Sequence, residues 1–243
     1  MRNIRSLLVL RAVAAVCGLG MSARASTIDL LAPANSAGVP LSSLLGGNIA
    51  TVGNLSFTNF GLVTQNNGAP NASQIMVQAF TAVVGEPGIT FSFNWTTSGI
   101  TTSPTNTMDT GIQFNVSAGG APIITDDYLA VSGGATASSQ WTVNESVTPS
   151  YGGVAGTLQN ILLNSNNVLS GTQLATATFA PATSLFVNKD IQLWTINSGG
   201  VANISHVSQG FSTTVPVPAA AWTGLSTLGG LAVLGLMRKR ARA

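Results

Sequence analysis

The chain alternates strictly between apolar and polar side chains in Ile89-Thr90-Phe91-Ser92-Phe93-Asn94-Trp95. A period of two residues is typical of a β-strand that buries one face and exposes the other. The same alternation occurs at residues 55–58, 112–116, 141–144 and 191–196. The segment from Ser26 to Thr214 is also rich in Gly, Ser, Thr, Asn and Val and poor in Glu, Lys and Arg. This composition favours strands and turns over helices.

Clusters of turn-forming residues separate the alternating segments, as in Asn66-Asn67-Gly68-Ala69-Pro70 and Asn197-Ser198-Gly199-Gly200. Their spacing predicts roughly nine to eleven strands in an all-β, jelly-roll-like antiparallel β-sandwich. Leu41 to Leu45 and Leu158 to Leu163 each fit a short helix as well as a strand. No linker interrupts residues 26–214, so we expect one exported domain, which is long enough to bury a core without cross-links.

The N-terminus has the three parts of a secretory signal peptide. Its basic residues are Arg2, Arg5 and Arg11. The apolar segment Ala12 to Met21 follows, and Ala23 and Ala25 then place small residues at the −3 and −1 positions of a cleavage site. We therefore expect residues 1–25 to direct export through the Sec pathway. A lipoprotein signal at Cys17 is the less favoured alternative, because the bulky Val16 precedes it.

The C-terminus carries an uncharged run from Ala219 to Met237. At about 1.5 Å per residue a helix of this length approaches the roughly 30 Å of a bilayer core. A basic cluster follows it, consisting of Arg238, Lys239, Arg240 and Arg242. The positive-inside rule then predicts a transmembrane helix with a cytoplasmic C-terminus and the preceding domain outside. A buried C-terminal helix of a soluble domain is the alternative.

Charge is distributed unevenly along the chain. Lys189 is the one Lys or Arg between residues 26 and 214, whereas all seven acids lie there, which gives this segment a formal charge of −6. So few cations exclude nucleic acid as a partner and disfavour phosphate or carboxylate substrates. The single cysteine, Cys17, lies in the predicted signal peptide. Disulfides, thiolate metal sites and cysteine nucleophiles are therefore not expected in the exported domain.

Few residues invite a chemical role. His206 is the one histidine; on a regular strand it shares a face with Ile204 and points away from Ser205, so no Ser–His pair is expected. The doublet Asp126-Asp127 is a weak candidate for Ca²⁺, with an ordinary pair of acids at a turn or strand edge as the favoured alternative. We predict no catalytic residue, no metal and no cofactor.

Aromatic residues offer one further candidate. Trp95, Trp141 and Trp194 lie in alternating segments, where such side chains usually belong to the core. The alternative is a platform of exposed rings on a sandwich face, which would stack on sugars.

The C-terminal pattern is similar to a known sorting signal. Its motif residues are Val215, Pro216, Val217, Pro218 and Ala219. Together with the Gly/Leu-rich run and the basic cluster, they make residues 215–243 resemble the PEP-CTERM signal, more closely its VPLPA-type variant. The resemblance implies an exported protein of a Gram-negative bacterium that makes exopolysaccharide. It also implies a transient anchor in the inner membrane and processing by an exosortase, followed by release to the cell surface or the extracellular space.

These features together predict a surface or matrix protein with a structural or adhesive role in biofilm or exopolysaccharide. A carbohydrate-binding surface module, with or without calcium, is the alternative, and an extracellular hydrolase is the least favoured reading. Hydrolysis of glycosides needs two carboxylates across one cleft, and no sequence pattern indicates such a pair.

Overall fold

The computed structural model describes residues 25–66, 68–81, 86–98, 106–120, 123–136, 139–149, 156–163, 169–195 and 199–214, with the backbone alone at 106, 156–163 and 169–172. The predicted signal peptide, apart from Ala25, lies outside these residues, as do the sorting motif, the membrane helix and the basic cluster. Among the described residues, no helix is long and apolar enough to cross a membrane.

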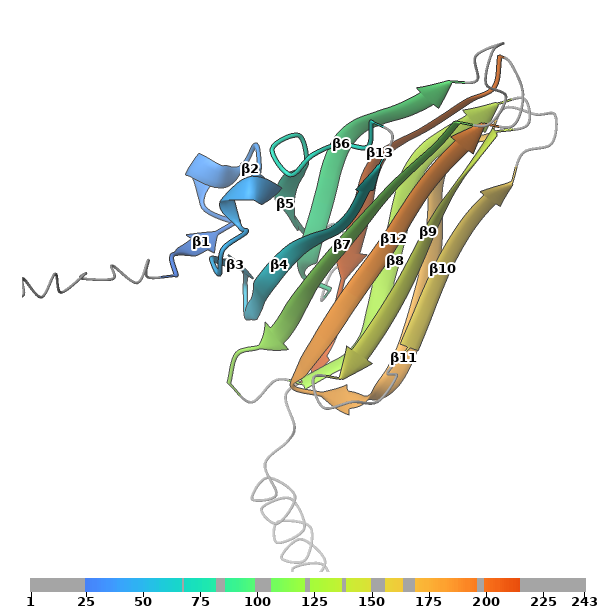
Figure 1. The fold of residues 1–243 in the computed structure, drawn as a ribbon. Helices are drawn as coiled ribbons and strands as arrows, with labels where there is room; N and C mark the ends of the chain where they lie inside the picture. The colour runs from blue at the N-terminus through green and yellow to red at the C-terminus, as the bar shows by residue number, and fades with distance from the viewer. Residues whose placement is uncertain are drawn as a thin grey trace, which may run out of the picture.

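The strands form two sheets. In order across the first sheet they are β1 (Thr27–Asp29), β3 (Ile49–Val52), β4 (Leu55–Asn66), β7 (Asn106–Ala118), β12 (Ser184–Thr195), β9 (Ser139–Pro149) and β10 (Gly156–Leu163). In the second sheet they are β11 (Leu169–Ala182), β8 (Ile123–Thr136), β13 (Val201–Gly210), β6 (Gly88–Ser98), β5 (Met76–Phe80) and β2 (Val39–Pro40), with β14 (Thr213–Thr214) paired to β8. Every described pair is antiparallel except β1 with β3 (Figure 1).

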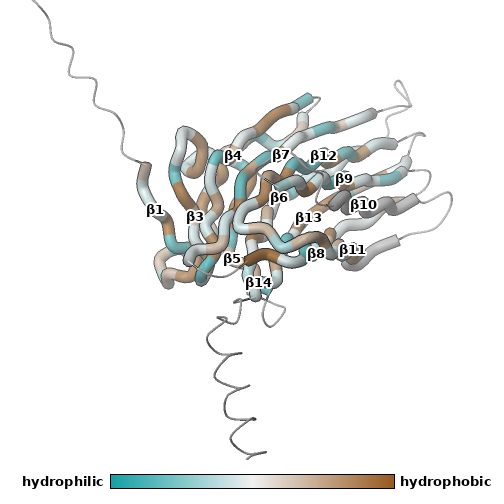
Figure 2. The backbone as a smooth tube through the Cα atoms, turned by 90° about the horizontal axis from the view of Figure 1, so that it is seen from below, coloured by the Kyte–Doolittle hydropathy of each residue, from teal (hydrophilic) through white to brown (hydrophobic). Residues whose placement is uncertain are grey.

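The two sheets pack face to face, and hydrophobic and hydrophilic residues alternate along many strands (Figure 2). Strand β12 is the clearest case, because every second residue from Leu185 to Thr195 is buried and the others are half-buried. Its inward side chains meet those of the second sheet, which is the packing expected of a sandwich.

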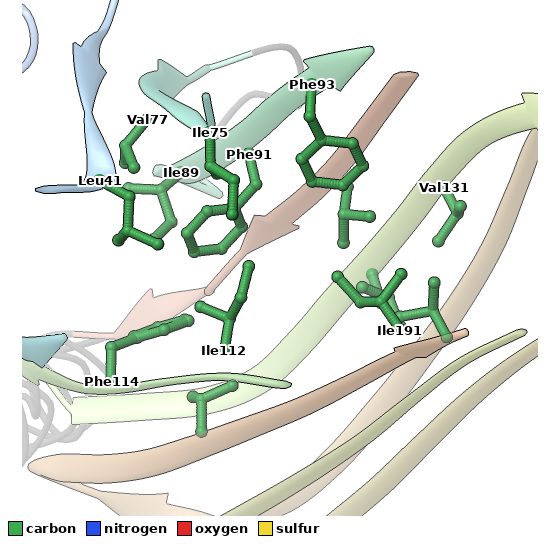
Figure 3. Close-up of a cluster of buried hydrophobic side chains, with 14 of the residues drawn as sticks. Leu41, Ile75, Val77, Ile89, Phe91, Phe93, Ile112, Phe114, Val131 and Ile191 are labelled. Atoms are coloured by element: carbon green, nitrogen blue, oxygen red, sulfur yellow. The ribbon is translucent and has the colours of Figure 1, made fainter. Parts of the chain in front are cut away.

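Aromatic and branched side chains fill the space between the sheets. The rings of Phe91 in the second sheet and Phe114 in the first lie 5.9 Å apart, and Ile112 packs beside them (Figure 3). Phe57 extends this cluster to Phe211, at 6.2 Å. Tilted ring pairs of this kind add to the free energy gained by removing apolar surface from water.

The all-β sandwich predicted from the alternation is confirmed. The described residues hold fourteen strands, more than expected, because several are too short to show alternation, such as Val39–Pro40 and Thr213–Thr214. Of the two ambiguous segments, the first contains a 3₁₀ helix at Leu41–Ser43, whereas the second lies in strand β10. Position beside a long neighbouring strand, and not local propensity, decides the second case.

Candidate functional site

A pocket of about 310 Å³ opens where the segment after β4 lies against β6. Its lining residues are Gly68, Pro70, Gln74, Asn94, Trp95 and Thr96. Strand alternation places Asn94 and Thr96 on the exposed face of β6, while the ring of Trp95 points into the sandwich and is only 2% exposed.

Local turns hold the other wall of the pocket. Gly68 has a φ of 84°, a left-handed conformation that glycine adopts without strain. The Ala69 amide donates to the Asn66 carbonyl at 2.9 Å, and the Asn71 amide donates to Gln74 Oε1 at 2.9 Å. These bonds fix the loop that forms this wall of the pocket.

The chemistry of the pocket is neutral. Gln74 and Asn94 carry amides, which both donate and accept hydrogen bonds, and Thr96 carries a hydroxyl. The indole of Trp95 stands behind them, with Nε1 donating to Met108 Sδ at 3.0 Å. Neutral donors and acceptors suit a ligand with many hydroxyl groups and no charge.

The outward face of the first sheet is a second polar surface. Along β12 it presents Phe186, Asn188, Asp190, Gln192 and Trp194, all half-buried. Asn188 pairs with Gln113 on β7 and with Ser146 on β9, so amides and hydroxyls continue across the neighbouring strands. Of the three tryptophans proposed for a platform, Trp95 and Trp141 belong to the core and Trp194 lies on this face.

Two carboxyl groups lie close together on that face. Burial, together with the hydrogen bond and the negative charge of Asp190, raises the pKa of Asp109 to about 6. Gln192 Nε2 donates to Asp190 Oδ2 at 3.0 Å. No group of three or more His, Cys, Asp or Glu side chains that would hold a metal occurs in the described part of the chain.

A third cluster lies inside the sandwich and joins its two sheets. Lys189 on β12 and Glu145 on β9 form an ion pair in which both side chains are fully buried. Gln209 on β13 donates its Nε2 to Asp127 Oδ1 and Oδ2 at 2.9 Å and to Glu145 Oε1 at 3.0 Å. All four residues are at most 1% exposed.

Burial dominates the protonation of this cluster. It raises the pKa of Asp127 to about 6, although the positive charge of Lys189 and the hydrogen bond from Gln209 act in the opposite direction. Burial likewise lowers the pKa of Lys189 to about 7, against the attraction of Asp127. No sequence pattern indicates this cluster, except that Lys189 is the one Lys or Arg in an acidic segment.

The structure does not bring the two residues of the calcium candidate together. Asp127 points into the core, whereas Asp126 lies on the opposite side of β8 and accepts a hydrogen bond from the Ser212 amide at 2.9 Å. Adjacent strand residues point to opposite faces, so their carboxylates do not converge on one ion.

The expectation that His206 shares a face with Ile204 is wrong. A register shift between Ile204 and His206 turns His206 to the exposed side while Ile204 stays buried. His206 Nδ1 then lies 2.9 Å from Ser205 Oγ. The Ser205 hydroxyl donates to the Ser132 carbonyl at 3.2 Å, so the imidazole does not receive its proton as the base of a nucleophilic pair would.

Comparison with known proteins finds likeness to solved structures. No protein-family model matches the chain, and no curated protein matches it. Solved structures with some likeness include TmCBM61 in complex with β-1,4-galactotriose (TM-score 0.30, 8% identity, 62% of this chain and 86% of that one). Another is a family 16 carbohydrate binding module (TM-score 0.25, 16% identity, 56% of this chain and 84% of that one).

A third is the enzymatically active domain of tailspike protein 4 of bacteriophage CBA120 (TM-score 0.29, 12% identity, 63% of this chain). This chain spans only 19% of that tailspike. Likeness at these TM-scores carries no inference about function.

Proposed function

We propose that this chain is an exported surface protein whose β-sandwich binds neutral carbohydrate. The observation that carries the proposal is the pocket of about 310 Å³, which presents the neutral polar side chains of Gln74, Asn94 and Thr96. Sugars present hydroxyl groups along their edges, and side-chain amides and hydroxyls donate hydrogen bonds to such groups and accept them.

The charge of the surface supports the same ligand class. Lys189 is the one Lys or Arg between residues 25 and 214, and it is fully buried. That segment therefore offers no cationic side chain of either kind to a phosphate, a sulfate or a nucleic acid. A neutral polymer needs no such partner.

A glycan array probed with the full chain tests the proposal. We expect binding to neutral glycans that survives high salt, because the pocket contacts are not ionic. The double variant Gln74→Ala/Asn94→Ala should lose most of the signal. Trp194→Ala, on the outward face of the first sheet, serves as the matched control and should keep it. A wild-type chain that binds no neutral glycan would contradict the proposal.

The localisation of the protein is a separate part of the proposal and rests on the resemblance of residues 215–243 to PEP-CTERM signals. We propose export through the Sec pathway, a transient anchor in the inner membrane and processing by an exosortase. Mass spectrometry of the mature protein should show a chain that starts after Ala25 and ends near Pro218. A mature chain that still contains the basic cluster would argue against processing.

A structural or adhesive role in biofilm or exopolysaccharide matrix is the second candidate. It is favoured by the same tail, and by the exposed Ser205–His206 pair, whose hydrogen bonds do not fit catalysis. The array separates the two, because a purely structural protein would give no ligand-specific signal.

A further inference from the structure

The one lysine of the sandwich faces a glutamate on the neighbouring strand. Lys189 and Glu145 are directly opposite each other in the antiparallel pairing of β12 with β9, and both side chains point into the interior. Opposite residues of such a pair have Cβ atoms about 5 Å apart, within reach of two long side chains. The ammonium nitrogen is in direct contact with Glu145 Oε2.

The surroundings of the pair are apolar. On either side of it, the inward cross-strand pairs are Val187 with Val147 and Ile191 with Val143, and all four side chains are fully buried. A charge enclosed in this way costs several kcal/mol of hydration that its partner only partly restores. Asp127 makes the balance worse, since two carboxyl groups share one lysine.

The charge balance of the cluster favours neutral groups. With the pKa of Lys189 near 7, a large share of its side chain is the uncharged amine at neutral pH. An amine with a free electron pair is a nucleophile, and a protonated carboxyl group is the electrophile it attacks in amide formation. A buried lysine against a buried glutamate thus holds both reactants of a condensation in contact.

We propose that Lys189 and Glu145 join in an intramolecular amide bond. The Lys189 Nζ electron pair attacks Glu145 Cδ, and the C–N bond forms. The Cδ–Oε2 bond then breaks, and Oε2 leaves as water with its own proton and one proton from Nζ. One hydrogen stays on the amide nitrogen, nothing is oxidised or reduced, and no co-reactant is needed.

Gln209 lies where the reaction needs a hydrogen-bond donor. During the attack negative charge develops on Glu145 Oε1, the oxygen that already accepts from Gln209 Nε2 at 3.0 Å. Donors aimed at a developing oxyanion in a dry site are among the strongest contributions to acyl chemistry. Asp127 acts through Gln209 as a positioning residue, because both of its oxygens hold the same Nε2.

Formation of the amide removes the desolvation cost of the buried ion pair. An amide has no net charge, so its burial needs hydrogen bonds but no counter-ion. The apolar walls also keep water away from the new bond, which protects it from hydrolysis.

Trypsin provides a direct test, because it cleaves after Lys and Arg and requires a free side chain. In the full chain the sites flanking Lys189 are Arg24 and Arg238. After unfolding and digestion, we expect one fragment of residues 25–238 whose mass is lower than the sequence mass by one water. Two separate fragments, 25–189 and 190–238, at their full sequence masses would overturn the proposal.

Two substitutions at Glu145 locate the bond. Glu145→Leu has no electrophile, so the chain should be cut at Lys189 and keep its full mass. If Glu145→Leu also lacks one water, the dehydration lies elsewhere and the proposal is wrong. Glu145→Gln tests the chemistry independently of any folding defect in the leucine variant. Its amide loses ammonia, so the linked product should have the same mass as linked wild type. Purified, folded Glu145→Gln that is cut at Lys189 would contradict the proposal.

Discussion

The carboxyl pair Asp109 and Asp190 shows how two acids on a crowded sheet face respond to each other. The pKa of Asp109 is raised from 3.8 to about 6, so its proton is held more tightly in the folded state than in the unfolded chain. The group therefore contributes stability that is fully present below pH 3.8 and is lost as the pH rises through about 6.

Asp109→Asn isolates this contribution. We expect the difference in unfolding free energy between variant and wild type to shift in favour of the variant as the pH rises from about 4 to about 6, because asparagine has no proton to lose. Urea unfolding at several pH values measures it. All other ionisable groups are the same in both proteins, so the difference between the two curves removes their contributions. A difference that does not change with pH in this interval would contradict the assignment.

A second prediction at a single residue concerns Gln209 and the rate at which the amide forms. Gln209→Met keeps the length of the side chain but removes the donor to Glu145 Oε1. Loss of one such donor should slow formation of the Lys189–Glu145 amide by about 100-fold. Refolding from denaturant and timed trypsin digestion give the linked fraction with time. If Gln209→Met disturbed the packing, the yield of folded protein would fall. If it only removes the hydrogen-bond donor, the linked fraction among folded molecules falls instead.

Strand β6 begins with a glycine, Gly88, at a point where the neighbouring strand lies very close. Gly88 pairs with Gly210 on β13, and a Cβ at Gly88 would collide with the carbonyl oxygen of Gln209. Because the obstacle is backbone, the strands must move apart. We expect Gly88→Ala to destabilise the protein by about 1 to 3 kcal/mol, as overpacked sites do.

Gly119→Ala is the matched control for that substitution. Its new Cβ would lie 3.4 Å from the Asn54 carbonyl oxygen, an ordinary contact, and the change should cost less than about 0.5 kcal/mol. Guanidinium unfolding midpoints of both variants check the pair. An equal loss of stability in the two variants would show that the close contact at Gly88 does not make an added Cβ costly.

The elements also show what alternation can and cannot predict. In segment 89–95 each apolar residue from Ile89 to Trp95 is buried, as the alternation predicts, although the polar Thr90 is buried as well. The predicted face of His206 is wrong because one register shift inverts the faces of β13. The pattern of apolar residues does not reveal such a bulge. The pocket residues Gln74 and Asn94 were not predicted either, because their meeting depends on how a loop returns to a distant strand.

For the whole molecule, the all-β class followed from composition and period, whereas the pairing of β12 with both β7 and β9 did not. Long-range pairing joins segments far apart in sequence, and single-sequence patterns do not specify partners. The interior cluster escaped prediction for a related reason. A lone lysine in an acidic chain reads as a surface charge, and only the packing of two sheets encloses Lys189 with Glu145 and Asp127.

The proposed amide has a consequence for global stability. A covalent link between residues 145 and 189 restricts the unfolded chain and should stabilise the fold by about 4 kcal/mol on the loop-entropy model used for cross-links. The triple variant Asp127→Asn/Glu145→Leu/Lys189→Met has neither charge nor link in this cluster. Without the amide, replacing buried ionised groups by neutral residues would be neutral or stabilising. Guanidinium midpoints therefore distinguish the cases by sign, because only a linked wild type should exceed the triple variant.

The burial of Lys189 also affects how this protein behaves on the bench. Amine-directed dyes and sensor-chip chemistry find no lysine on the native sandwich, since Lys189 is the one lysine between residues 25 and 214 and is enclosed. The remaining primary amines of the chain are the α-amino group and Lys239. Coupling by amines thus tethers each molecule through its ends and leaves both faces of the sandwich unmodified for measurements of ligand affinity.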